Sequence, residues 1–276
     1  RKRVTVALSG DGGDELLAGY ITHSADRLYA TLSHLPLPAI EAVKWLLGLL
    51  PESRRKVNVL FKAKQFFSGF PLDPCSAHAW WRMLIAPDAL ARMFGYQGKE
   101  YLPDVFEPFR SAYNQAENLD FLGRFLYVDY KTWLVDDILV KADRASMNHG
   151  LEIRSPFLDH RLVEFCASLP ASLKVRSMRG KYLLRRFARG LVPESAVRRK
   201  KTGFNAPVSD WLCDSWRELV RENLSKSAVS AAGFIDPDLV EEMVTEHFSG
   251  RRDYGYFLFA LLMLVMWMRR VRPNVY

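Results

Sequence analysis

Apolar residues recur at a helical spacing along most of the chain and at the spacing of a strand in one place. Residues 4–8 form the β-branched run Val-Thr-Val-Ala-Leu, which predicts a strand. Helical patterns follow at residues 16–32, 39–50, 57–67, 88–94, 119–148, 159–169, 180–189, 239–248 and 255–271, and a short helix is expected after Pro193. Asp159 can cap the helix that runs to residue 169. One predicted strand among many helices fits the helical remainder of an α/β domain whose other strands lie upstream. Such a piece would expose an unpaired strand edge and apolar surface.

A glycine-rich acidic turn, SGDGGDELLAGY at residues 9–20, follows the predicted strand directly. Its glycines can adopt positive φ and approach a ligand closely, and successive N–H groups in such a turn can bind an anion. Asp11, Asp14 and Glu15 add hard oxygen ligands of the kind that Mg²⁺ prefers. A nucleotide or metal site and an ordinary strand-to-helix turn both fit this stretch taken alone.

A second candidate lies in the helix expected at 119–148. Asp137, Lys141 and Arg144 are spaced at i, i+4 and i+7, so they share one helical face. This face is either functional or an ordinary ladder of salt bridges within the helix. The basic amphipathic helices at 39–50 and 57–67 are in turn better explained as core helices with solvated lysines than as membrane-surface helices.

Composition narrows the functional classes. With 276 residues, of which 49% are hydrophobic, the chain can bury a core of one or two domains. The three cysteines and six histidines show neither a disulfide framework nor the spacing of metal ligands, which favours a reducing cytoplasm. The net charge of +8 is compatible with nucleic-acid binding, but no nucleic-acid motif accompanies it. The apolar segment 256–268 is shorter than the roughly 20 residues that span a bilayer, so we interpret it as a buried helix.

Four motifs in one order make the sequence specific. SGDGGDELLAGY at residues 9–20 is followed by LVKADRASM at 139–147, LEIRSPFLDHR at 151–161 and RKKTGFNAP at 199–207, with Trp211 beyond. This series resembles the synthetase domain of glutamine-dependent asparagine synthetases over roughly positions 4 to 270. The resemblance implies an adenine nucleotide α-hydrolase-like parallel sheet with helices on both sides.

Two parts of that family's enzymes are not found in the chain. They are a pyrophosphate loop of the Ser-Gly-Gly-x-Asp-Ser type and an amidotransferase domain whose N-terminal cysteine hydrolyses glutamine. We therefore interpret residues 1–276 as the C-terminal portion of a synthetase domain. We expect this piece to be inactive alone, with the glutaminase domain as its partner in the same parent chain, and a homodimer is left open.

The resemblance also implies a reaction. An ATP-dependent ligase converts aspartate to asparagine through β-aspartyl-AMP, with ammonia from glutamine and with ATP and Mg²⁺ as cofactors. Ser9, Gly10 and Gly12 match positions that border the nucleotide, and Asp14 matches the Mg²⁺ carboxylate. Lys201 matches the lysine that contacts the phosphates. Asp11 stands where several family members have Glu. The resemblance implies a role for this position in the second half-reaction, in which ammonia displaces AMP.

Further residues come from the other motifs. Asp136 or Asp137 lies where the family places a carboxylate facing the acyl-adenylate, and the sequence does not separate the two. Asp143, Arg144, Glu152 and Arg154 are expected near the same cleft, and Glu152 and Arg154 could instead form a buried structural pair.

Two alternatives remain. A related enzyme would adenylate another carboxylate, as a β-lactam synthetase-like enzyme or an amidotransferase acting on cell-surface sugars does. A non-catalytic basic helical module would bind anionic partners.

Overall fold

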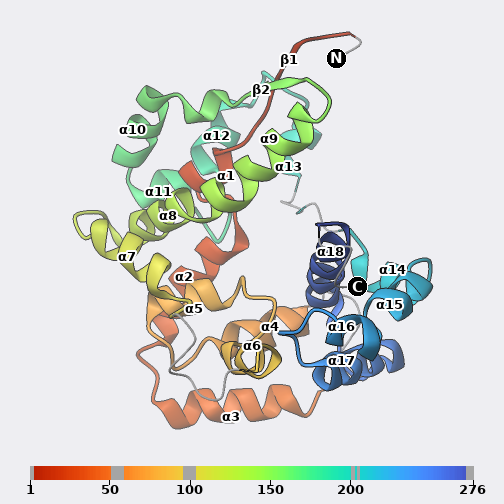
Figure 1. The fold of residues 1–276 in the computed structure, drawn as a ribbon. Coiled ribbons are helices and arrows are strands. Elements are labelled where there is room, and N and C mark those ends of the chain that lie inside the picture. Colours follow the sequence, from red (N-terminus) through yellow and green to blue (C-terminus); the bar gives the residue numbers. More distant parts are fainter. Residues whose placement is uncertain (1–2, 51–58, 96–103, 200–202, 204–205, 272–276) are drawn as a thin grey trace. The chain divides into compact units, whose positions relative to one another are not determined.

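The computed structural model describes residues 3–50, 59–95, 104–199, 203 and 206–271 (Figure 1). The chain forms two units, Arg1–Ala42 with Phe66–Trp81 and Phe106–Thr202, and Val43–Gln65 with Arg82–Val105 and Gly203–Tyr276. Helices dominate both units, and a small parallel sheet belongs to the first. The expected α/β character is therefore confirmed in this coarse sense.

Elements of the first unit begin with β1 Val6–Leu8, α1 Gly13–Leu16, α2 Ile21–Leu32 and the start of α3 Leu37–Gly48. They continue with the end of α4 Val59–Ser68, then α5 Pro74–Trp80, α7 Glu107–Gln115, α8 Phe121–Lys131, a π-helix at Leu134–Leu139, α9 Val140–Met147, β2 Glu152–Arg154 and a 3-10 helix at Pro156–Leu158. The unit closes with α10 His160–Ser168, α11 Ala171–Lys174, α12 Tyr182–Phe187 and α13 Glu194–Arg198.

The sheet pairs β1 with β2 in parallel, with Ala7 opposite Ile153. Only one strand was expected, so β2 is an addition to the sequence prediction. Its three residues, Glu-Ile-Arg, are too few to produce a strand pattern. The ladder continues past the strands, where the Ser9 amide donates to the Arg154 carbonyl at 2.9 Å. This pairing brings two of the four sequence motifs together. Leu8 of β1 is 74% exposed.

The chain turns sharply between β1 and α2. Gly12 has φ +86°, and a Cβ there would come within 2.3 Å of Leu158 Cδ2. Ala18 also has positive φ, at 55°. The prediction of a single helix at 16–32 is therefore wrong in detail. The chain forms the one-turn α1, leaves the helical conformation, and forms α2 from Ile21.

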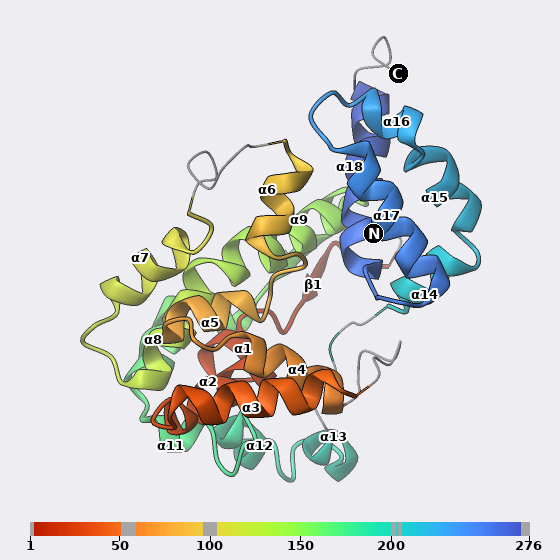
Figure 2. The ribbon, with the colours of Figure 1, turned by 90° about the horizontal axis from the view of Figure 1, so that it is seen from below.

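Helix α8 lies beside α1 and α2 (Figures 1 and 2) and packs against both. Its Phe125 and Val128 are completely buried. The long helix expected at 119–148 is interrupted after α8, where the Thr132 hydroxyl bonds to the Val128 carbonyl at 2.8 Å and the helix widens into the π-helix. A hydroxyl that bonds back onto the preceding turn commonly bends a helix, and π-helical turns are frequent at functional sites.

The second unit packs around its last helix. It contains α6 Pro87–Met93, α14 Val208–Cys213, α15 Arg217–Asn223, α16 Lys226–Ser230, α17 Pro237–Ser249 and α18 Gly255–Val271. Leu258 and Val265 of α18 are fully buried against Leu212, Val220 and Val240. The expected burial of this helix is confirmed for that face, while Trp267 on α18 is 60% exposed. Among the described helices, none combines the length and apolarity needed to cross a bilayer.

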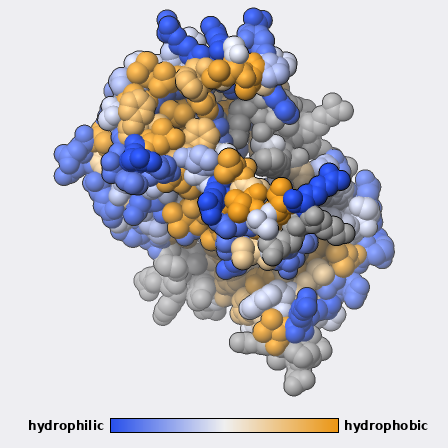
Figure 3. Space-filling view, turned by 90° about the horizontal axis from the view of Figure 1, so that it is seen from above, coloured by the Kyte–Doolittle hydropathy of each residue, from blue (hydrophilic) through white to orange (hydrophobic). Residues whose placement is uncertain are grey.

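Large apolar side chains also reach the surface, and Figure 3 shows patches of them between charged groups. Leu37, Trp45, Leu46 and Leu49, on and just after α3, are all more than half exposed.

One glycine offers a direct test of how α12 is placed. Gly180 has no room for a side chain, because a Cβ there would lie 1.7 Å from the Ala18 carbonyl oxygen. Gly180→Ala is expected to lower the free energy of unfolding by roughly 1–3 kcal/mol or more, measured by urea denaturation.

Gly48→Ala is the matched control, because nothing lies within 4 Å of a Cβ at this helical glycine. It should leave stability unchanged or raise it by up to about 1 kcal/mol. Equal behaviour of the two variants would contradict the close approach of residues 18 and 180.

Candidate functional site

Hydrogen bonds of side chains and backbone hold the acidic turn in place. The Ser9 hydroxyl donates to Asp11 Oδ2 at 2.9 Å and lies 2.8 Å from the Ser155 hydroxyl, just after β2. Gly13 N–H bonds back to the Gly10 carbonyl at 3.3 Å. The turn stands at the carboxyl end of β1, which is where open parallel sheets bind ligands.

Asp14 begins the short helix α1 and forms an ion pair across the unit. Lys181 Nζ lies 3.0 Å from Asp14 Oδ1, with the two side chains 23% and 15% exposed. The Lys181 amide also donates to the Leu17 carbonyl at 2.8 Å. Gly19 is required here, since a Cβ would lie 1.8 Å from Asp14 Oδ1 and 2.4 Å from Lys181 Cε. The ion pair and the backbone hydrogen bond therefore hold the turn against the start of α12.

Sequence reasoning missed Lys181. It precedes a six-residue helix in a basic stretch, and nothing local separates it from a solvated lysine. The one available signal was its position directly after Gly180, at the start of an expected helix.

Arg185, one turn into α12, anchors the chain that leads toward the fourth motif. Its Nη1 donates to the carbonyls of Val197 at 2.5 Å and Arg199 at 3.0 Å. Burial lowers the pKa of this guanidinium, and the nearby Asp14 carboxylate opposes that effect. Lys201, expected at the phosphates, lies outside the described residues. Arg185 therefore anchors the backbone of the last described residues before Lys201.

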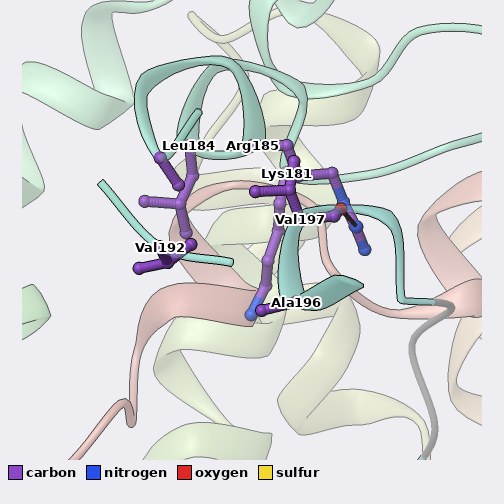
Figure 4. Close-up of a pocket in the computed structure, with 7 residues that line it drawn as sticks. Lys181, Leu184, Arg185, Val192, Ala196 and Val197 are labelled. Atoms are coloured by element: carbon purple, nitrogen blue, oxygen red, sulfur yellow. Dashed lines mark hydrogen bonds between the residues drawn. The ribbon is translucent and has the colours of Figure 1, made fainter. Parts of the chain in front are cut away.

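A pocket of about 210 Å³ lies between α12 and α13, and Lys181 and Arg185 are among its lining residues. In Figure 4 the ends of these two side chains point in different directions from the start of α12. The rest of the lining is apolar. Its volume is below the roughly 300–1,000 Å³ of typical ligand pockets, so it does not by itself form a nucleotide site.

Glu15 points into the protein behind the turn. It is 2% exposed and accepts a hydrogen bond from the Tyr20 hydroxyl at 2.5 Å. Burial raises the pKa of Glu15 above its ordinary 4.5, although the Tyr20 bond opposes the shift. Burial together with the Glu15 contact also raises the pKa of Tyr20. This pair is thus a buried support of the turn.

Two carboxylates just before the second motif lie on the widened part of the helix. Asp136 and Asp137 belong to the π-helix, the first exposed and the second half-buried. Asp137 pairs with Lys141 at 3.5 Å, which is one rung of the expected ladder, and within the described residues neither aspartate hydrogen-bonds to the acidic turn. Asp143 and Arg144 are exposed on α9, which packs against β2.

Glu152 and Arg154 form an ion pair along β2, with 2.7 Å between Arg154 Nε and Glu152 Oε1. Their side chains are 53% and 66% exposed, so the alternative of a buried structural pair is wrong. They alternate with Ile153 and therefore project to the face opposite to it. Arg154 nevertheless adjoins the turn through its backbone bond to Ser9.

A metal site at the turn would depend on a bound nucleotide. Within the described ranges, no three His, Cys, Asp or Glu side chains gather to hold an ion. Mg²⁺ held with a nucleotide usually takes one or two carboxylates together with phosphate oxygens and water, so a single Asp14 fits that mode. Because the Lys181 ammonium already contacts Oδ1, a metal ion would bind at Oδ2 or displace the ammonium.

The Asp14–Lys181 pair predicts a measurable loss of stability. Lys181→Met keeps the apolar stem but leaves Asp14 without this cation, and we expect a loss of about 1–3 kcal/mol in urea denaturation. Asp14→Asn in the same chain should recover part of that loss, because the stranded charge is removed.

Lys226→Met is the control. This ammonium also pairs with two carboxylates, those of Asp238 and Glu241, each at 2.9 Å, but its side chain is half exposed. We expect a clearly smaller effect there. Similar losses in both variants would show that Asp14 and Lys181 behave as an ordinary surface pair.

Comparison with known proteins supplies the family. The asparagine synthase family model matches residues 1–269. Asparagine synthetase [glutamine-hydrolyzing] 1 of Bacillus subtilis is 28% identical over 269 residues, which cover 97% of this chain and 40% of the relative. Asparagine synthetase [glutamine-hydrolyzing] 3 of the same organism is 34% identical over 102 residues, covering 34% of this chain and 17% of the relative.

A fungal relative carries a different name. Amidase chyE of Penicillium rubens is 27% identical over 284 residues, covering 91% of this chain and 39% of the relative. No solved structure gives a significant match. The chain spans about two fifths of the length of the first curated relatives that it matches. Because the family model covers nearly all of it, the chain belongs to the asparagine synthase family.

Proposed function

We propose that this chain supplies part of the adenylating site of an ATP-dependent amide-forming ligase that converts aspartate to asparagine. The observation that carries the proposal is the glycine-rich acidic turn at the end of β1, with Ser9 bonded to Asp11 and Asp14 held by Lys181. Family membership supports it. The parallel pairing of β1 and β2 also supports an adenine nucleotide α-hydrolase-like sheet, of which these strands would form one edge.

The chemistry has two steps. A carboxylate oxygen of aspartate attacks the α-phosphorus of ATP, and pyrophosphate leaves. Ammonia then attacks the acyl carbon of β-aspartyl-AMP, AMP leaves, and a base accepts the proton that nitrogen loses. Because charge develops on phosphate in the first step, preorganised donors and cations contribute most of the catalysis.

The residues divide these tasks as follows. Backbone N–H groups of the Ser9–Gly12 turn would border the nucleotide, and Lys201 would neutralise phosphate charge as a compact ammonium. Mg²⁺, when bound with ATP, would supply further charge stabilisation at Asp14. Asp11 is one hydrogen bond from Ser9, so its carboxylate would stand beside the adenylate as the base for the second step.

The remaining sites join the same proposal. Asp136 or Asp137 would face the acyl group, and Asp143, Arg144, Glu152 and Arg154 would line the cleft on the side of α9 and β2. An N-terminal glutaminase domain of the parent protein would deliver ammonia, in a cytoplasmic enzyme without nucleic-acid partners.

A different acceptor is the second candidate. Asp11 is shorter by one methylene than the Glu that several family members carry, and one relative is named an amidase. The same turn would then activate another carboxylate.

The deciding experiment measures asparagine and pyrophosphate formed by the full-length protein with ATP, Mg²⁺, ammonium and aspartate. Lys201→Ala should lower the rate roughly 10²–10³-fold, as loss of one charge-stabilising group does. Lys226→Ala, at an exposed lysine of α16, should leave the rate unchanged.

Activity with another carboxylate but not with aspartate would favour the second candidate. Unchanged activity in the Lys201 variant would overturn its assignment. Measurable aspartate-dependent pyrophosphate release by residues 1–276 alone would contradict the expectation that this piece is inactive.

A further inference from the structure

Four ionisable side chains form a continuous chain in the interior of the first unit. Asp26 and His23 come from α2, His78 from α5 and Asp129 from α8. His78 Nδ1 lies 2.9 Å from both carboxylate oxygens of Asp26, and His78 Nε2 lies 3.1 Å from Asp129 Oδ1. Asp129 Oδ2 lies 2.7 Å from His23 Nε2. All four side chains are completely buried.

These contacts restrict the arrangement of protons among the four side chains. An ionised carboxylate only accepts hydrogen bonds, and a neutral imidazole has one N–H. His78 faces a carboxylate with each ring nitrogen, so with both carboxylates ionised it satisfies both only as an imidazolium. His23 Nε2 faces Asp129 Oδ2, while its Nδ1 is buried with no hydrogen-bond partner in the described structure, a geometry that fits an Nε2–H tautomer. With both aspartates ionised, the array then carries one cation between two anions.

Such a buried array is poorly explained by packing alone. Removing carboxylates and an imidazolium from water is costly, and apolar residues of similar volume often give equal or greater stability. Helices in apolar contact can shift along one another at little cost. A shift of α2 or α5 along α8 would instead leave a buried charge unpaired. The array thus defines the position of these helices sharply.

The buried array is linked to the acidic turn through α8 and Tyr20. α8 packs against both α1 and α2, so it links the array to the turn. The ring of Tyr20, just before α2, lies 5.6 Å from that of His23, and the Tyr20 hydroxyl holds Glu15, the neighbour of Asp14. The Phe125 ring stacks on His78 with 4.9 Å between the ring centroids, and both side chains are completely buried.

We propose that Asp26, His78, Asp129 and His23 are positioning residues of the adenylating site, holding the imidazolium of His78 between two carboxylates so that Tyr20 and Glu15 support the acidic turn. This inference rests on the proposed function for its effect on catalysis. Its proton arrangement and its effect on the turn can be measured without that function.

The first measurement is ¹⁵N NMR of the full-length protein labelled at histidine, at about pH 8. His78, assigned by loss of its signals in His78→Gln, should show two protonated ring nitrogens. His23 should show one, at Nε2. A singly protonated His78 would overturn the proposal.

The second measurement compares His78→Gln with His247→Gln. His247 is a matched control, because it is 3% exposed and lies in the other unit. We expect kcat for pyrophosphate release to fall about ten-fold or more in His78→Gln, with KM for ATP nearly unchanged, since a displaced turn misplaces reacting groups. His247→Gln should retain kcat at a comparable loss of Tm.

Hydrogen exchange of residues 9–20 separates this inference from the proposed function. Exchange should be about ten-fold or more faster in His78→Gln than in wild type, and unchanged in His247→Gln, as expected for loss of local stability. If the wild type forms no adenylate, the proposed function fails while NMR and exchange still decide the positioning role. Wild-type exchange in His78→Gln, or equal acceleration in both variants, would overturn it.

Discussion

The ion pair between Asp14 and Lys181 connects the two ends of the candidate site. The acidic turn precedes Lys181 by most of the first unit, yet both Lys181 groups contact it, the ammonium at Asp14 and the amide at Leu17. Gly19 and Gly180 leave the room that this contact needs. Because Arg185 then binds the carbonyls of Val197 and Arg199, α12 connects the turn to the stretch that leads toward Lys201. A site assembled from distant motifs depends on such a connection.

The support beneath the turn is polar as well. Glu15, the neighbour of Asp14, accepts a hydrogen bond from Tyr20, and the Tyr20 ring contacts His23 of the buried array. An apolar core would hold the same helices with less precision, because its contacts are not directional. The proposed site would have to place a carboxylate, a nucleotide and ammonia within reacting distance, and such a site gains from supports that fix position.

Sequence reasoning succeeded where a motif was local. The strand before the turn, the cap at Asp159 and the buried face of α18 followed from neighbouring residues, and Asp159 does accept from the Arg161 amide. It failed where the decisive partner was distant: β2 forms only because β1 pairs with it, and Lys181 matters only because Asp14 reaches it. The break at Thr132 was missed because a hydroxyl bonding back to Val128 leaves no trace in hydrophobic periodicity. α5 was missed although Pro74 follows a capping Asp73, since its apolar run is short.

We propose that this scaffold activates a carboxylate by adenylation, and isotope exchange tests this mechanism most directly. With ATP, Mg²⁺ and aspartate but no ammonia or glutamine, the full-length protein should exchange labelled pyrophosphate into ATP, because the adenylating step reverses while the acyl-adenylate waits. Exchange that requires aspartate is the predicted result. Absence of exchange with aspartate, in protein that still forms asparagine from ATP, would contradict the adenylate mechanism.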